Sequence, residues 1–288
     1  MDRHAATKQC ILALEQWYET MIPALFPMML LSNILVDTGF ASKIGKLCNR
    51  TIFRVLKISN NGCYCMLTGF FFGFPMGAKT VVDMRKQMQI SEKEAEYLLT
   101  FINCIGPMYT INLIHTLFPQ QSLWKLLAGI YILPLFYGIF LRYTIYRKDY
   151  YQSTKYSQPL HEEVSCVIEY KSFSDALYEC VPKCGKSILI LGGYMILFQI
   201  SFVTLQHILV SVNLVTNVFY PLLEITGGLF KLPYDTSLSA ILFYTNFGGG
   251  CCMMQTYSFL KSAGIPIKKY ILHKTVLSIL AFLIGHIL

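Results

Sequence analysis

The sequence predicts an all-helical protein that crosses a membrane several times. Of its 288 residues, 54% are hydrophobic and only 14% are charged, whereas a soluble domain carries about 25% charged residues. A helix of about 20 apolar residues crosses a bilayer core. Most of the stretches that lack Asp, Glu, Lys and Arg are long enough to do so: 20–36, 58–78, 97–124, 126–141, 187–223, 236–260 and 275–288. We expect about five full spans and two hairpins, counted as about seven or eight apolar segments.

The charges fit membrane orientation better than nucleic-acid binding. The chain has 24 Lys and Arg against 16 Asp and Glu, a formal net charge of +8. The basic residues are scattered singly between apolar stretches, and they form no continuous basic patch of the kind that contacts nucleic acid. We therefore expect a lipid bilayer and no nucleic acid as partners, with the basic residues in loops. Placing the long polar segment in the cytoplasm puts the N-terminus outside.

The chain divides into two membrane halves. Residues 1–141 form the first half and its crossing helix, 142–174 form a polar connector, and 175–288 form the second half. The stretch 187–223 is too long for one span and is expected to turn near 207–213. Because an odd number of crossings separates the halves, we predict two inverted repeats, an arrangement found in many transporters.

Two glycine-rich segments interrupt the apolar stretches, one in each half. The first contains Gly73, Pro75 and Gly77, and the second contains Gly248, Gly249 and Gly250. Pro lacks a backbone donor and Gly favours non-helical backbone. Lipid cannot satisfy the freed peptide groups, so such breaks face protein or a water-filled cavity. We expect both segments to be tips of re-entrant helical hairpins that converge on one cavity; close helix packing at glycine is the alternative.

Several polar residues near these breaks are candidates for solute contact. Asn103 and Gly106 lie beside Pro107 after the first segment, and Asn246 and Gln255 flank the second. Capping of freed backbone groups and ordinary bonds between helices are the alternatives for the side chains. Glu224 is the only acid between Glu179 and Asp235. An acid at membrane depth is a candidate functional group, so we expect Glu224 to be a proton-coupling group or the partner of a base. A place at the membrane interface in an amphipathic element is the alternative.

The residues around the first break resemble a known family. GFFFGFPMGAKTVVDMRKQMQISEKEAEYLLTFINCIGPMY is similar to the GYPxGA, IS..EAE.LL and N.xGP signature of the YlbJ-type sporulation integral membrane proteins, within the nucleoside-recognition (Gate) domain family. LLEITGGL and FGGGCCMMQTYSFLKSAGIP are similar to the later segments of that family. Phe74 stands where Tyr is usual, and the family's extra N-terminal hydrophobic segment is not found in this sequence.

The resemblance implies inverted repeats with two hairpins and transport of dipicolinic acid during endospore formation. Such a small anionic solute needs backbone N–H donors and positive potential, which the two glycine-rich tips would supply. Lys79 would add a fixed charge; a lysine that extends to the membrane interface is the alternative. The resemblance also implies an integral protein of the bacterial cell membrane or the outer forespore membrane.

The sequence gives no reason to expect an enzyme, a cofactor or a metal site. It contains no GxSxG, HExxH, Walker A or GxGxxG motif. Its ten Cys and six His show no metal-ligand spacing, and the Cys are expected to be small packing residues. The alternatives to a dipicolinate transporter are a nucleoside or metabolite carrier of the Gate family and a non-transporting membrane component of the sporulation machinery. The oligomeric state is left open.

Overall fold

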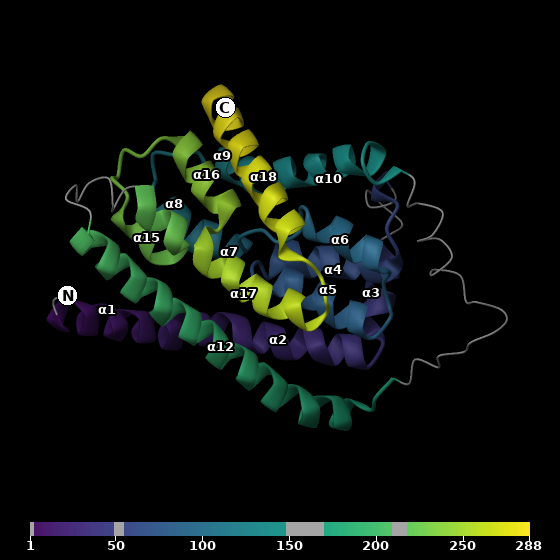
Figure 1. Cartoon of the computed structure of the whole chain (residues 1–288). Helices are drawn as coiled ribbons and strands as arrows, with labels where there is room; N and C mark the ends of the chain where they lie inside the picture. The colour runs from purple at the N-terminus through teal and green to yellow at the C-terminus, as the bar shows by residue number, and fades with distance from the viewer. Residues whose placement is uncertain (1–2, 49–54, 148–169, 209–217) are drawn as a thin grey trace.

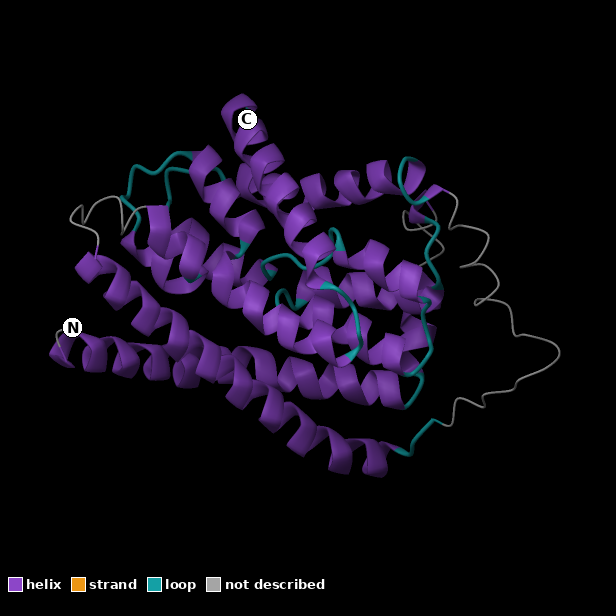
Figure 2. Cartoon of the chain, viewed as in Figure 1, coloured by secondary structure: helices purple, strands orange, loops and turns teal. Residues whose placement is uncertain are grey.

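A computed structural model describes residues 3–48, 55–147, 170–208 and 218–288 of the chain. Every regular element in these residues is helical (Figure 2), which confirms the predicted all-helical class. The expected turn near 207–213 and most of the connector 142–174 lie outside the described residues.

Four helices in the described part of the chain are long and apolar enough to cross a membrane. They are Cys10–Asp37, Leu123–Tyr143, Phe173–Leu205 and Ile267–Ile287. These helices confirm a multi-pass membrane protein in contact with a lipid bilayer. They are one fewer than the five or so full spans expected, because the stretch 97–124 is interrupted by non-helical backbone.

The helices of the first half come in the following order. They are α1 (Arg3–Gln16), the π-helical turn η1 (Trp17–Met21), α2 (Ile22–Asp37), α3 (Phe40–Cys48), α4 (Asn60–Phe71), α5 (Met76–Lys86), α6 (Glu92–Leu99), α7 (Pro107–Tyr109), η3 (Thr110–Ile114), α8 (His115–Leu117), α9 (Leu123–Leu127), η4 (Ala128–Ile132) and α10 (Leu133–Tyr143). The second half contains α12 (Phe173–Ile208), α14 (Tyr220–Leu223), α15 (Ile225–Lys231), α16 (Leu238–Phe247), α17 (Gly249–Ser262) and α18 (Ile267–Ile287).

The first glycine-rich segment joins two helices that pack along each other, α4 and α5. Ser59 begins α4 as its N-cap, because its hydroxyl accepts a hydrogen bond from the Gly62 N–H at 3.0 Å. The chain turns at Gly73, whose φ of +74° is a left-handed conformation that glycine adopts without strain. Near the tip, a Cβ on Gly77 would lie 2.7 Å from the Gly69 Cα. Glycine therefore lets the two helices approach closely.

The second glycine-rich segment differs from the expected hairpin. Gly248 joins α16 to α17, but α16 packs along α18 while α17 packs against α5 and α12. The two helices follow one another across the break and do not fold back (Figure 1). The residues that do fold back in this half are those of α14 and α15, since a Cβ on Gly228 would lie 2.4 Å from the Pro221 Cα. Glu224 occupies the turn between them.

The two halves pack against each other through their long helices. α12 runs beside α2 (Figure 1), and the Trp17 indole N–H donates to the Ile188 carbonyl at 3.0 Å across this contact. A second layer forms where α4, α5 and α6 pack against α10, α17 and α18 around a common apolar core. The interrupted helices are therefore enclosed by longer ones.

Candidate functional site

A cavity of about 370 Å³ lies where the interrupted helices meet. Its wall includes Phe74 and Pro75 from the α4–α5 tip, Gly106 from the break before α7, and Glu224 from the turn between α14 and α15. Cys251, Cys252 and Gln255 of α17 and several residues of η1 and α2 complete it. Pockets for small ligands begin at about 300 Å³, so the space suits a small solute. Of the expected site residues, Pro75, Gly106, Glu224 and Gln255 line this cavity.

Glu224 is the one charged residue among those that line the cavity. It is buried, and its two carboxylate oxygens accept hydrogen bonds from the Thr226 N–H at 2.9 Å and the Gly227 N–H at 2.6 Å. The side chain thereby acts as the N-cap of α15. No basic side chain in the described residues forms an ion pair with it. Glu224 is therefore enclosed by protein.

Besides Glu224, the polar residues that line the cavity include Gln255, Tyr109, Thr20 and Thr226. The Gln255 amide donates only a long contact to the Cys251 Sγ at 3.4 Å, so most of its hydrogen-bonding capacity is free for a solute. The buried Tyr109 hydroxyl points toward Thr226 without reaching a hydrogen bond of normal geometry. The sequence analysis missed Tyr109, although its place directly after Gly106 and Pro107 could have indicated it. A solute in this cavity would meet one carboxylate, one amide, one phenol and two threonine side chains.

The expected glycines bring the broken segments together. A Cβ on Gly73 would lie 2.4 Å from the Gly106 N, so the hairpin tip touches the break before α7. A Cβ on Gly248 would lie 2.9 Å from the Phe74 ring, and one on Gly249 would lie 3.2 Å from the Ile225 N. Gly250 meets the Phe198 ring in the same way. The two glycine-rich segments therefore lie close together, although Phe74 and Pro75 line the cavity and the glycines of these segments do not.

The two expected asparagines hold helices together. The Asn103 amide donates to the Tyr270 hydroxyl at 2.8 Å and to the Thr256 hydroxyl at 3.3 Å, and its oxygen accepts from the Ala78 N–H at 3.4 Å. Asn246 donates to the Gly129 carbonyl at 3.2 Å and to the Leu242 carbonyl of its own helix. Neither residue lines the cavity, and both make the structural bonds that were the alternative interpretation.

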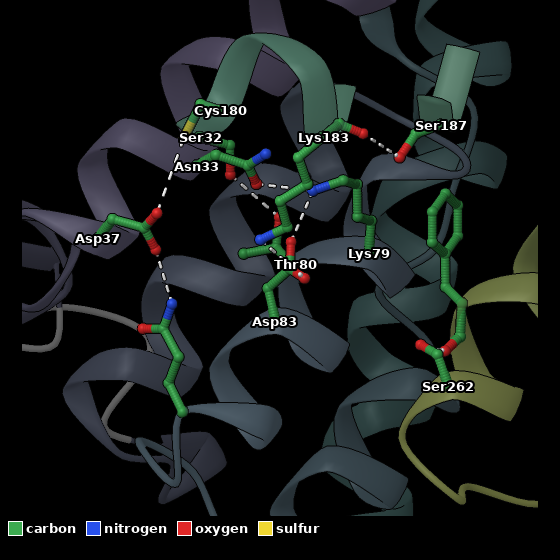
Figure 3. A network of polar contacts seen from close by, with 12 residues as sticks. Ser32, Asn33, Asp37, Lys79, Thr80, Asp83, Cys180, Lys183, Ser187 and Ser262 are labelled. Atoms are coloured by element: carbon green, nitrogen blue, oxygen red, sulfur yellow. Dashed lines mark hydrogen bonds and ion pairs between the residues drawn. The ribbon is translucent and has the colours of Figure 1, made fainter. Parts of the chain in front are cut away.

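Lys79 lies in a separate polar network between α2, α5 and α12 (Figure 3). Its ammonium group is 2.6 Å from the Asp83 carboxylate and donates to the Asn33 Oδ1 at 2.6 Å. Lys79 is therefore paired within the protein and is not among the residues that line the cavity. The i, i+4 spacing of Lys79 and Asp83 on one helix was the sequence signal for this pair.

The network continues onto α12. The Lys183 ammonium lies 3.6 Å from the second Asp83 oxygen, and the Asn33 amide donates to the Cys184 Sγ at 3.1 Å. Figure 3 also shows Asp37 with a contact to Cys180, at 3.7 Å. These contacts join the two halves of the chain, and they lie along α5 away from the cavity.

Lys274 of α18 is a second buried lysine, and the sequence analysis assigned it no role. Its side chain is 3% exposed, its ammonium donates to the Asn103 carbonyl at 2.8 Å, and it lies 5.1 Å from the centre of the Phe74 ring. No local pattern marks this residue, because its partners are far away in the sequence.

Comparison with known proteins identifies one relative. The chain is 26% identical over 262 residues to the sporulation integral membrane protein YlbJ of Bacillus subtilis (strain 168). The match covers 87% of this chain and 63% of YlbJ, so the chain spans less than two thirds of the length of its relative. No family model matches the sequence, and no solved structure is similar to the fold.

The similarity extends over most of the described helices and agrees with the multi-pass membrane architecture. It confirms the resemblance that the glycine-rich and acidic segments indicated. The chain is therefore an integral membrane protein that is similar to the sporulation integral membrane protein YlbJ.

Proposed function

We propose that this protein is a membrane transporter that carries a small anionic solute during endospore formation, with dipicolinic acid as the solute. The observation that carries the proposal is the cavity, because three segments of non-helical backbone converge around it. Broken helices at membrane depth are tolerated where they line a cavity, and in transporters they mark the binding site. The sporulation role follows the relative, and dipicolinic acid follows the resemblance to its family.

The order of elements suggests how the cavity opens to each side. In each half a long helix precedes a pair of helices that fold back, then an interrupted helix, and then a second long helix. We pair α4–α5 with α14–α15, and the break before α7 with the break at Gly248. The sequence alone suggests instead that the two glycine-rich segments correspond, one in each half. Two inverted repeats of this kind would allow one part to move against the other around the cavity.

Glu224 is proposed as the coupling group. Its carboxylate faces the cavity with no basic partner in the described residues, and an anionic solute would be repelled by it unless a proton bound there. Dipicolinate uptake would therefore require a proton at Glu224. The second candidate solute is a neutral nucleoside. Its hydroxyl groups would donate hydrogen bonds to the Glu224 carboxylate, so Glu224 also favours this candidate.

Uptake by purified protein in liposomes tests the proposal. We expect labelled dipicolinate to accumulate faster when an inward proton gradient is imposed, and the Glu224→Gln variant to lose this acceleration. Gln keeps an oxygen that can accept from the α15 backbone, so the fold should survive. Glu92→Gln is the matched control, because Glu92 is exposed and makes only a 3.7 Å contact with Arg85.

Three results would contradict the proposal. Uptake of a nucleoside without dipicolinate uptake would favour the second candidate. Equal acceleration in the wild type and in Glu224→Gln would remove the coupling role. Absence of uptake for every solute, together with normal dipicolinate content in spores that lack the gene and any second homologue, would favour a non-transporting component of the sporulation machinery.

A further inference from the structure

Lys274 carries a buried charge that the described protein does not neutralise. An ammonium group has three protons to donate, and the Asn103 carbonyl accepts one of them at 2.8 Å. No carboxylate in the described residues forms an ion pair with it. The aromatic face of Phe74 provides its other contact.

The other fully buried lysine shows what a neutralised site looks like in this fold. Lys79 has the Asp83 carboxylate and the Asn33 amide oxygen, each at 2.6 Å. An ammonium group without such a partner is costly to bury, and ionisable residues at membrane depth usually have a functional reason to be there. Lys274 therefore lacks a negatively charged partner in the described residues. A bound anion would supply one.

Lys274 lies directly behind the wall of the cavity. The Phe74 ring lines the cavity and also contacts the ammonium group. Phe74 thus contacts both a buried cation and the space assigned to the solute. The ring belongs to the hairpin tip, where the backbone is not helical.

We propose that Lys274 is the anion-binding residue of the transport site, and that a carboxylate of the solute takes the place beside its ammonium group that the Phe74 ring holds in this structure. This inference rests on the proposed transport function. The apolar wall would pack against a flat ring, and Glu224, carrying the proton that the proposed coupling requires, would donate a hydrogen bond to the solute. The solute class is a small aromatic acid that presents one carboxylate to Lys274 and a hydrogen-bond acceptor to the protonated Glu224.

The variant Lys274→Met separates a binding role from a structural one. Met keeps the length and the apolar packing of the side chain but removes the unpaired charge. If Lys274 serves solute binding, the variant should unfold at the same temperature as the wild type or higher, because functional sites often reduce stability. If Lys274 serves to hold the Asn103 carbonyl, the unfolding temperature should fall.

Liposome uptake provides the functional readout. We expect Lys274→Met to raise the KM for dipicolinate by about tenfold to a hundredfold, the range for loss of a hydrogen bond to a charged group. Lys274→Arg should retain part of the affinity because it keeps the charge. Lys268→Gln is the control, since Lys268 is an exposed lysine of the same helix, and its KM should equal that of the wild type.

Binding can be measured independently of transport. Dipicolinate should raise the unfolding temperature of the detergent-solubilised wild type and leave that of Lys274→Met unchanged. Transport by Lys274→Met with a wild-type KM, or an equal thermal shift in both proteins, would overturn the assignment of Lys274 while leaving the transporter proposal intact. A lower unfolding temperature of Lys274→Met without dipicolinate would also overturn it. Absence of uptake and of any thermal shift in the wild type would instead refute the proposed function.

Discussion

Lys79 and Lys274 stand in similarly apolar parts of the sequence, but the fold neutralises only one of them. Asp83 lies one helical turn after Lys79, and Lys183 of α12 approaches the same carboxylate from the other side. Lys274 meets a backbone carbonyl and an aromatic ring. The two buried lysines therefore differ in their partners: Lys79 has a carboxylate, and Lys274 has none in the described residues.

The buried pair predicts an asymmetric effect on stability. Asp83→Leu leaves the Lys79 ammonium with Asn33 alone, and we expect the free energy of unfolding to fall by about 3 kcal/mol, the range for breaking one side of a buried ion pair. Lys79→Met should cost less, because Asp83 keeps Lys183 at 3.6 Å. Denaturant unfolding in detergent micelles measures both changes.

Two further variants complete this test. The double variant Lys79→Met/Asp83→Leu should recover much of the lost stability, since well-packed apolar residues often replace a buried pair without loss. Lys269→Met breaks the ion pair between Lys269 and Glu96, in which the lysine is largely exposed. This variant should change the free energy of unfolding by less than about 1 kcal/mol. Equal losses of unfolding free energy in Asp83→Leu and Lys79→Met would contradict the expectation that Asp83 keeps a charged partner and Lys79 does not.

At the scale of elements, short helices begin where a side chain accepts the first free N–H groups. Ser91 and Ser237 begin α6 and α16 in this way, and Glu224 begins α15. These caps fix where each broken helix restarts, and hence which residues face the cavity. The α4–α5 tip then meets the α16–α17 break through Phe74 and Gly248.

Crosslinking tests the contact between these two breaks. In a background without the ten native Cys, Phe74→Cys and Gly248→Cys should be joined by a short bifunctional thiol reagent. The Phe74 ring reaches within 2.9 Å of the Gly248 Cβ position, so the two backbones are about one side chain apart. After proteolysis between the two sites, the crosslinked fragments should stay joined on a denaturing gel. Fragments that separate would show that the tips lie apart.

The matched control uses the opposite end of α17. Ser262 is exposed and lies about 14 residues beyond Gly248, and a helix of that length extends about 20 Å. Phe74→Cys paired with Ser262→Cys should not crosslink with the same reagent. Crosslinking of the control pair at the same rate would indicate unspecific reaction and would remove support for the contact.

For the whole molecule, the two halves are held together by contacts that do not depend on the connector. α12 packs on α2, with the Trp17–Ile188 hydrogen bond and the Lys183–Asp83 ion pair across the joint. Asn103 bonds to Thr256 and Tyr270 in the other half as well. The halves should therefore recognise each other as separate chains.

Coexpression of residues 1–147 and 170–288 as two polypeptides tests this expectation. A tag on the first piece should copurify the second in mild detergent, because the buried bonds between the halves remain intact. Asp83→Leu in the first piece should weaken the copurification, whereas Lys269→Met in the second should not. Recovery of the tagged piece alone would show that the packing of α12 on α2 requires the covalent link.

The sequence by itself determined the membrane class, the helical content and the places where helices break. These follow from local chemistry: apolar composition needs a bilayer, and Gly and Pro interrupt helices wherever they lie. The resemblance to YlbJ-type proteins is also carried by short local motifs. The sequence further placed Glu224, Gln255 and the first hairpin tip near one site.

Only the tertiary structure decided which break folds back and which polar side chains face the cavity. Gly248 was predicted to be a hairpin tip, but α16 pairs with α18, and the chain folds back at Glu224 instead. Lys274 gained its importance from Asn103, which lies 171 residues earlier. The physical reason is that burial and pairing of charges depend on neighbours from distant segments, and local composition does not specify those neighbours.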